Sequence, residues 1–384
     1  MKDSPVSRSG RIIRQPEGYR AFIPEPLPPK PPIRMDDEML DLLSKADRAL
    51  GRLDGSIETI PNPDLFVFMY VRKEAVLSSQ IEGTQASLED LLVYEAKAKE
   101  TQAPVDIEEV SNYVEAMRYG LKRLETLPVS LKLIREIHEK LLTGVRGGNR
   151  APGEFRTSQN WVGPAGCNLE TATHVPPPPH EMMKAMGDLE GFIHSRVPMP
   201  ILIKVALIHA QFETVHPFLD GNGRVGRLLI TFLLCEEGIL KQPLLYLSIF
   251  FKKNRQEYYD RLQATRNTGD WENWVKFFLR GVYEVSQEAT STARRILQLR
   301  EEHRGVILQQ ARLNSAKTLL LLEALYRKPF MTIPEMTSLM DISFQTANRI
   351  ASNLLKTGIL KEVTGLRRNR VFEYAPYTAL FKEE

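Results

Sequence analysis

Between Met35 and about Arg295, apolar residues recur every three or four positions in segments long enough to form helices. This spacing places the apolar side chains on one face of each helix, where they can pack against neighbouring helices. Representative sets are Met39, Leu42, Leu43, Ala46 and Leu50, then Val110, Tyr113, Val114, Met117 and Leu121. Glycine and proline dominate only from Gly144 to Pro179, where helices are not expected. The pattern predicts an all-α core interrupted by one irregular segment.

The chain has 384 residues, which is too long for one ordinary domain and predicts two or three folding units. Residues 1–34 are rich in proline, and we expect an extended arm that lies along a surface and serves only packing. Residues 35–125 and 126–295 are interpreted as two helical regions. A polar connecting helix is expected at roughly Glu284–Gln310. Residues 296–384 are interpreted as this linker helix, which begins slightly before the boundary, and a C-terminal domain.

The C-terminal domain shows a different order of elements. Three short helices are predicted at 315–326, 332–340 and 343–357, and two strands at 359–363 and 370–374. Three helices followed by a hairpin are typical of a winged helix-turn-helix. Within residues 315–370, nine lysines and arginines oppose four acids, which is consistent with weak DNA binding at best. The basic hairpin tip holds Arg367, Arg368 and Arg370, and a role in protein contacts remains an equal alternative.

Composition restricts the class of protein. Apolar residues make up 42% and charged residues 26% of the chain, as in soluble globular proteins. The net charge of +3 excludes a coat for nucleic acid over the whole chain but leaves room for a local basic patch. Cys167 and Cys235 are too few for a disulfide framework or a cysteine-rich zinc site. With no secretory signal and no apolar run of membrane-spanning length, we expect a cytoplasmic protein without a membrane partner.

A glycine-rich turn leads directly into a helix in the segment His216-Pro217-Phe218-Leu219-Asp220-Gly221-Asn222-Gly223-Arg224-Val225-Gly226-Arg227. Such a turn at a helix N-terminus is an anion-binding site, because the free N–H groups point at the ligand. Arg224 and Arg227 share one face of the helix and can bind further phosphate oxygens. Asp220 is a hard oxygen ligand suited to Mg²⁺, and His216 can act as a base near neutral pH. The segment predicts a site for a phosphate ester.

This segment resembles the motif of the Fic family, His-Pro-Phe-x-(Asp/Glu)-Gly-Asn-Gly-Arg-x-x-Arg, at every fixed position. The resemblance extends to the surrounding helices, to the region from about Pro63 to Leu92 and to the C-terminal domain. It implies an all-helical Fic core with a β-hairpin flap. It also implies a protein adenylyltransferase, which transfers AMP from ATP and Mg²⁺ to a serine, threonine or tyrosine of a target protein or of itself, with release of pyrophosphate.

The resemblance also implies a role for each residue of the loop. His216 would take the proton of the target hydroxyl, and Asp220 would hold Mg²⁺ between the α- and β-phosphates. Gly221, Asn222 and Gly223 would surround the α-phosphate, with Asn222 stabilising its developing charge. Arg224 would contact the β-phosphate and Arg227 the γ-phosphate. The remaining loop residues assigned to the ATP site are Pro217, Phe218, which would anchor the loop, and Leu219.

Two further segments complete the implied site. Asn160–Val175 is expected to form a hairpin with Gly163, Pro164, Ala165 and Gly166 at its tip. In the family the matching flap holds the target peptide as an added strand, and here it would comprise Thr171, Ala172, Thr173, His174 and Val175. Tyr258 and Tyr259 match tyrosines that the family places near the nucleotide base. The other histidines show no zinc-type spacing and are interpreted as structural or surface residues.

An inhibitory motif lies upstream in Ser78-Ser79-Gln80-Ile81-Glu82-Gly83, within a helix that starts near Asn62 and Pro63. Ser78 and Glu82 are four residues apart and share a helix face. The segment resembles the family motif (Ser/Thr)-x-x-x-Glu-(Gly/Asn). The resemblance implies that Glu82 pairs bidentately with Arg227 and withholds it from the γ-phosphate, with Ser78 and Gly83 completing the motif.

Alternatives remain open at this stage. The chain could be a DNA-binding regulator whose Fic core only senses a nucleotide, in which case the loss of His216 would not matter. It could act mainly in AMP removal, or transfer UMP, phosphate or phosphocholine instead of AMP. The presence of both Arg224 and Arg227 favours a nucleoside triphosphate donor. By analogy with family members of this layout, a homodimer is expected.

Overall fold

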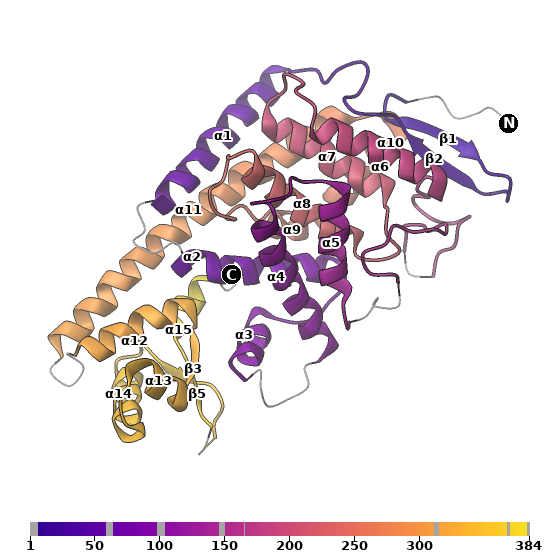
Figure 1. Ribbon diagram of the computed structural model, residues 1–384. Helices are drawn as coiled ribbons and strands as arrows, with labels where there is room; N and C mark the ends of the chain where they lie inside the picture. Colours follow the sequence, from indigo (N-terminus) through magenta and orange to yellow (C-terminus); the bar gives the residue numbers. More distant parts are fainter. Residues whose placement is uncertain are drawn as a thin grey trace.

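A computed structural model describes residues 7–58, 64–97, 104–145, 150–164, 166–310, 315–366 and 369–381. The prediction of a mainly helical chain is confirmed (Figure 1). The helices of the main body are α1 (Asp37–Glu58), α2 (Asp64–Ile81), α3 (Leu88–Lys97), α4 (Val105–Arg123), α5 (Leu131–Leu142), α6 (Pro179–Ile193), α7 (Ile201–Val215), α8 (Asn222–Glu236), α9 (Ser248–Lys253), α10 (Arg255–Thr268) and α11 (Trp271–Gln309).

Local sequence signals fix several helix starts. The Ser130 side chain accepts from Leu133 N and caps α5, and Asp270 caps α11 in the same way. A capping box between Thr332 and Glu335 begins a helix of the C-terminal unit, as the N-cap threonine predicts. The predicted start of α2 near Asn62 and Pro63 lies outside the described residues.

The centre of the main body is α7, which is buried along almost its whole length and packs against α8. The side chains around these two helices include some of the largest buried ones, namely Phe212, Phe218, Phe232, Trp271 and Trp274. The loop between α7 and α8 therefore starts and ends on rigid, fully packed elements. A site on this loop is held more firmly than one on a surface connection.

The longest helix, α11, runs beside α1 and then continues into the C-terminal unit (Figure 1). The sequence predicts a separate connecting helix from about Glu284, and this is wrong, because one helix runs from Trp271 to Gln309. The apolar face continues without a break through Val285, Ala289, Ala293 and Ile296. Further on, His303 is hydrogen-bonded to the Tyr374 hydroxyl at 2.7 Å. The predicted domain boundary at residue 295 falls inside this helix.

The N-terminal arm is only partly extended. It forms an antiparallel hairpin of β1 (Gly10–Arg14) and β2 (Arg20–Pro24), which the sequence analysis does not predict. The cross-strand pairing satisfies backbone groups that a proline-rich extended chain would leave to water. Arg8 forms an ion pair with Glu272, and Phe22 N donates to Val175 O at 2.9 Å. The arm thus packs on the main body as expected, but with regular structure.

The C-terminal unit lies at the other end of the molecule from the hairpin (Figure 1). It comprises α12 (Ala316–Arg327), β3 (Phe330–Thr332), α13 (Ile333–Met340), α14 (Phe344–Lys356), β4 (Lys361–Glu362), β5 (Val371–Glu373), α15 (Ala375–Thr378) and a short 3₁₀ helix (Ala379–Phe381). The strands form one antiparallel sheet in the order β3-β5-β4. The order of elements matches the expected one, with shorter strands and the additional β3. The winged-helix interpretation and DNA binding stay predictions.

Side chains of the C-terminal unit make contacts within the unit and with α2. Arg370, expected at a phosphate-binding wing, is hydrogen-bonded to Asn348 of α14. Arg367 and Arg368 lie outside the described residues. The Phe381 ring packs edge-on against Tyr70 of α2 at 5.4 Å. The C-terminal unit therefore contacts the helix that carries the predicted inhibitory motif.

Among the described helices, none combines the length and the apolarity required to cross a bilayer.

Candidate active site

The loop between α7 and α8 reverses the chain twice. His216 ends α7 with a left-handed backbone at φ 48°, which is uncommon outside glycine, and Gly221 precedes α8 at φ 76°. The reversals bring residues 216–221 over the N-terminus of α8. There the N–H groups of Asn222, Gly223 and Arg224 have no partner within the helix. Together with the helix dipole, they give this turn the geometry of an anion site, and phosphate binding there stays a prediction.

Asn222 holds the loop closed on itself. Its Oδ1 accepts from Phe218 N and its Nδ2 donates to Phe218 O, both at 2.8 Å. Phe218 is buried and stacks on His138 with ring centroids 3.7 Å apart, as its predicted anchoring role requires. The side-chain amide of Asn222 is therefore committed to the loop. The backbone N–H of Asn222, at the first turn of α8, is the group placed to meet a phosphate oxygen, and its predicted role there stays a prediction.

Three side chains that sequence reasoning missed support the loop from outside. Arg156 Nε donates to His216 O at 2.9 Å, and Asn160 Nδ2 donates to Phe218 O at 2.8 Å. His138 Nε2 donates to Asp220 O at 3.0 Å. These residues precede the loop by 56 or more positions, and nothing in their spacing indicates the contacts. Polar residues in the glycine- and proline-rich segment are the only available signal for Arg156 and Asn160.

His216 is placed in a cationic surrounding. Burial, with the guanidinium groups of Arg266 and Arg156 nearby, lowers the pKa of His216 to about 4. The imidazole is therefore neutral at physiological pH and can accept a proton. The left-handed backbone at this residue is held by Arg156 on its carbonyl and by the bond from its N–H to Phe212 O. Backbone strain maintained by such contacts is frequent at functional sites.

Asp220 lies at the rim of the anion site. Its side chain is 43% exposed, and its Oδ1 accepts from Gly221 N at 2.6 Å. Within the described ranges, no group of three or more histidine, cysteine, aspartate or glutamate side chains could hold a metal ion. A single carboxylate beside an anion site fits Mg²⁺, which binds one or two carboxylates together with substrate phosphates and water. The role of Asp220 as a Mg²⁺ ligand stays a prediction.

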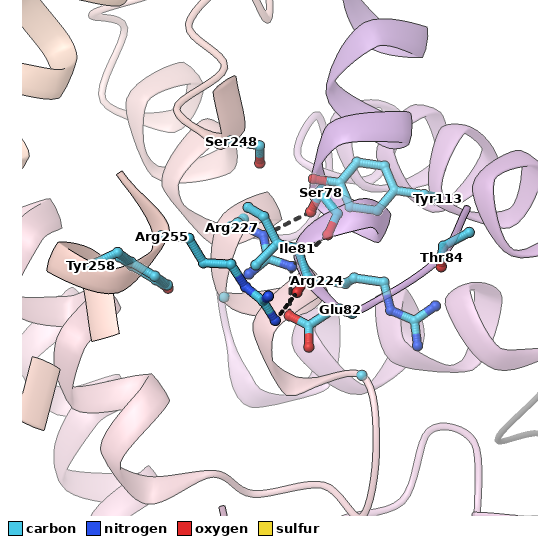
Figure 2. A network of polar contacts seen from close by, with 12 residues as sticks. Ser78, Ile81, Glu82, Thr84, Tyr113, Arg224, Arg227, Ser248, Arg255 and Tyr258 are labelled. Carbon is cyan, nitrogen blue, oxygen red and sulfur yellow. Dashed lines mark hydrogen bonds and ion pairs between the residues drawn. The ribbon is translucent and has the colours of Figure 1, made fainter. Parts of the chain in front are cut away.

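Arg227 of α8 is held by the end of α2 (Figure 2). Its Nε donates to Ser78 Oγ at 2.8 Å, and its Nη2 donates to Ser78 O at 2.9 Å and to Glu82 Oε1 at 2.8 Å. The structure brings together Ser78, Glu82 and Arg227, as the resemblance implies. The bidentate carboxylate pairing is wrong, because Ser78 supplies two of the three acceptors. The Arg227 side chain is 2% exposed, so it has little freedom to reach a ligand.

Glu82 follows directly after the last residue of α2, and Gly83 closes the turn through a bond from its N–H to Gln80 O. The Glu82 side chain is 36% exposed and faces the anion site. Burial raises its pKa, but the charge of Arg227 and the hydrogen bond from it outweigh this effect, so the pKa lies below its ordinary value. Glu82 is therefore ionised at neutral pH. A Cβ atom on Gly223 would lie 2.1 Å from Glu82 Oε1, which places this carboxylate against the first turn of α8.

Buried contacts fix α2 in this position. Arg255 Nη2 donates to Ile81 O at 3.1 Å. One turn before Ser78, the Glu74 carboxylate accepts from Tyr113 at 3.0 Å and from Ser248 at 2.5 Å. Burial raises the pKa of Glu74 to about 7 despite these hydrogen bonds. The inhibitory helix is thus connected to α4, α9 and α10 by polar contacts that sequence spacing does not reveal.

The two predicted base-contacting tyrosines differ in their surroundings. Tyr258 is buried and donates its hydroxyl to His209 Nε2 at 2.9 Å, while His209 Nδ1 donates to Gly226 O. Tyr259 is exposed, and the Arg255 guanidinium lies 5.7 Å from its ring centroid. A contact of Tyr258 with the nucleotide is therefore corrected: its ring is part of the core, and only Tyr259 offers a surface. His138, His174 and His209 are structural, as expected.

The predicted flap is not a regular hairpin. Between Asn160 and Val175, the described residues contain one antiparallel bridge, Val162 with His174. His174 is buried and donates from Nε2 to Thr214 O at 2.8 Å, so it fixes the segment to α7. Thr171 and Thr173 are exposed and Ala172 is half-buried, whereas Val175 is buried. Asn168 and Thr171 bond to one another instead of extending a ladder. Ala165 lies outside the described residues.

Sequence models of a known family match this chain in two places. The model described as Fic/DOC family N-terminal matches residues 40–122, and the model described as Fic/DOC family matches residues 128–234. The first range contains α2 with Ser78 and Glu82, and the second contains the loop and α8. The two parts of the site therefore come from the two matched regions.

Similar proteins carry related names. A protein adenylyltransferase Fic from Aedes aegypti is 36% identical over 155 residues, which cover 39% of this chain and 27% of that protein. One from Drosophila sechellia is 31% identical over 253 residues, covering 62% of this chain and 45% of that protein. The chain thus spans less than half the length of these relatives. A Fic family protein from Desulfovibrio desulfuricans has the same fold, with a TM-score of 0.59 at 20% identity over 89% of this chain and 97% of that one. The chain thus contains a Fic/DOC N-terminal region at residues 40–122 and a Fic/DOC domain at residues 128–234.

Proposed function

We propose that this chain is a protein adenylyltransferase that transfers AMP from ATP to a serine, threonine or tyrosine hydroxyl of a target protein and of itself. The observation that carries the proposal is the convergence of a neutral imidazole, free helix N–H groups and two arginines on one loop. The printed names of the Aedes and Drosophila relatives support the same chemistry. In this proposal Glu82 holds the activity back.

In the proposed reaction each of these groups has one role. The His216 imidazole accepts the proton of the target hydroxyl, whose oxygen bonds to the α-phosphorus as the bond to the β-phosphate oxygen breaks. Pyrophosphate leaves, and AMP remains on the protein. The N–H groups at the start of α8 stabilise charge on the α-phosphate, and Arg224 stabilises the leaving group. Mg²⁺, held by Asp220 and the phosphates, would neutralise further charge. Positioning and electrostatics account for most of the rate.

Glu82 opposes this reaction in two ways. It takes part of the hydrogen-bonding capacity of Arg227, which leaves the γ-phosphate without that partner. It also places a negative charge against the first turn of α8, where a phosphate would bind. Removal of the carboxylate relieves both effects, so we expect Glu82→Gly to raise AMP transfer.

Labelled ATP tests the proposal. Purified wild type, Glu82→Gly, His216→Ala and the double variant are incubated with ATP labelled at the α-phosphate, Mg²⁺ and a cell lysate. We expect Glu82→Gly to incorporate at least tenfold more label than wild type, both in itself and in lysate proteins. His216→Ala should abolish incorporation in either background while ATP binding persists. Incorporation that survives His216→Ala would refute the mechanism, and equal incorporation with and without Glu82 would refute the inhibition.

A second candidate direction is AMP removal from a modified protein. The observation that favours it is the position of the ionised, partly exposed Glu82 carboxylate at the anion site, where it could orient a water molecule. The substrate for this test is the protein labelled by Glu82→Gly. If wild type releases AMP from it and Glu82→Gly does not, removal is the activity of the inhibited form. Stable label in the presence of wild type rejects this candidate.

A further inference from the structure

The two arginines of the motif differ in how they are held. Arg227 makes three hydrogen bonds, whereas Arg224 lies 3.6 Å from Glu109 and 3.6 Å from Asp220, beyond hydrogen-bond distance. The Arg224 Nε and Nη1 atoms are buried and have no hydrogen-bond partner among the described residues. The Arg224 side chain is 4% exposed. It is therefore a buried cation with counter-charges close by but with donors still available.

Glu109 comes from α4, outside the loop and outside the inhibitory motif. Its side chain is 2% exposed, and Thr84 Oγ1 donates to its Oε2 at 3.2 Å. The same oxygen is the one nearest Arg224. Thr84 follows Gly83 and is itself fixed by a bond from its N–H to Ser79 O at 3.2 Å. In Figure 2, Arg224 reaches toward the side of Thr84, away from Arg227. A rigid contact therefore holds the Glu109 carboxylate beside Arg224.

The two counter-charges of Arg224 are not equivalent. Asp220 is at the rim and 43% exposed, and in the proposed function it serves Mg²⁺. Glu109 is fully enclosed, where charge interactions are screened least by solvent. When Asp220 binds the metal ion, Glu109 is the fixed carboxylate that remains to orient the guanidinium. Without Glu109, the buried guanidinium group of Arg224 would no longer be oriented by a fixed carboxylate.

We propose that Glu109 is a positioning residue that aims Arg224 at the phosphate adjoining the transferred one, with Thr84 holding Glu109 in place. The inference rests on the proposed function. It predicts a separation between binding and turnover. Without the Glu109 charge, the anion site becomes more positive and binds ATP more tightly, but Arg224 no longer stabilises the departing pyrophosphate. A residue needed only for folding would weaken binding and turnover together.

The experiment uses Glu82→Gly as the active parent. Into it we place Glu109→Gln, which keeps the shape and the acceptor for Thr84, and Thr84→Val, which keeps both charges. Glu115→Gln on the same helix is the control, because Glu115 is exposed and pairs with Arg118 at 2.9 Å. We expect Glu109→Gln to lower kcat for self-modification at least tenfold without raising KM for ATP. Thr84→Val should lower kcat in the same direction by about threefold, and Glu115→Gln should match the parent. A kcat within twofold of the parent for Glu109→Gln overturns the inference, as does a loss of kcat with a parallel rise in KM.

ATP affinity provides a readout that does not depend on turnover. Calorimetric titration with ATP in EDTA should give a Kd at least threefold lower for Glu109→Gln than for the parent. The gain should disappear in Arg224→Met, so that the two changes are coupled in a double-mutant cycle. If the parent transfers no AMP, the proposed function fails while this cycle still decides the role of Glu109. Additive effects, or an unchanged Kd in Glu109→Gln, would show that Glu109 does not act through Arg224.

Discussion

Gly223 and Glu82 are in such close contact that any side chain at position 223 would have to displace the Glu82 carboxylate. An ideal Cβ atom there would lie 2.1 Å from Glu82 Oε1 and 2.9 Å from Arg227 Nη1. The glycine of the predicted phosphate-binding turn therefore also leaves room for the Glu82 carboxylate. In the proposed function, the missing side chain at position 223 would thus accommodate both the phosphate and the inhibitory residue.

Gly223→Ala should destabilise the protein in a way that depends on Glu82. The added methyl group must displace the carboxylate and disturb its bond to Arg227, which costs about 1–3 kcal/mol, as for other overpacking substitutions. In Glu82→Gly the nearest contact, the one with Glu82 Oε1, is absent, so the cost should be smaller. Chemical denaturation of the four proteins of this cycle measures the difference. Equal destabilisation in both backgrounds would contradict the close contact.

Ser78→Ala should release the inhibition partly. It removes the Oγ acceptor of Arg227 Nε but leaves the Ser78 carbonyl and Glu82 in place. The net loss of one hydrogen bond corresponds to about 0.5–1.5 kcal/mol, so self-modification should rise about two- to tenfold and less than in Glu82→Gly. Ser79→Ala is the matched control, since Ser79 Oγ is buried and has no partner among the described residues. Equal rates in the two serine variants would exclude a role for the hydroxyl.

The pH dependence of AMP transfer should lack the acid limb of an ordinary histidine. Burial and the charges of Arg266 and Arg156 lower the pKa of His216 to about 4, so the base stays neutral until the pH falls to this range. In Glu82→Gly, with saturating Mg²⁺, kcat/KM should remain level from about pH 8 to pH 5.5 and decline only below. An acid limb centred near pH 6.5 would mean that His216 is not in the surrounding described here.

Glu74 should make stability depend on pH. Burial raises the pKa of the Glu74 carboxyl group from its ordinary value of 4.5 to about 7 in the folded protein. The folded protein therefore binds the proton of this group more tightly than the unfolded chain does. Stability contributed by the proton is therefore lost as the pH rises from about 4.5 through 7, up to about 3 kcal/mol. Glu74→Gln has no proton to lose, and its Tm relative to wild type should rise between pH 5 and pH 8. A Tm difference independent of pH would contradict the shift.

The contiguous part of the site could be predicted from sequence. Residues 216–227 contain the base, the acidic residue, the glycine-rich turn and both arginines in one continuous segment. The free N–H groups at the start of a helix always point outward along its axis, so their direction could be predicted as well. The pairing of Arg227 with Ser78 and Glu82 was predictable only through resemblance, because the residues are 149 and 145 positions apart. Glu109, Thr84 and Arg156 carry no such pattern. Their roles arise from tertiary packing, which sequence spacing does not encode.

Errors in local structure have physical causes as well. The sequence does not indicate that the side-chain amide of Asn222 closes the loop, because its bonds to the backbone of Phe218 depend on the turn geometry. Prolines favoured an extended arm, yet the strands of the hairpin lie before most of them. The segment ending at Val175 has strand-forming residues, but a buried bond from His174 to Thr214 fixes it as a loop.

The uninterrupted helix α11 sets the angular position of the C-terminal unit. Successive residues of an α-helix are rotated by about 100°, so a single inserted residue would swing everything beyond it by that angle and shift it by about 1.5 Å. Phe381 would then no longer meet Tyr70 on α2. Seven inserted residues, close to two whole turns, would restore the rotation but shift the unit along the helix axis by about 10.5 Å. The length of α11 is thus what brings the C-terminal unit against α2.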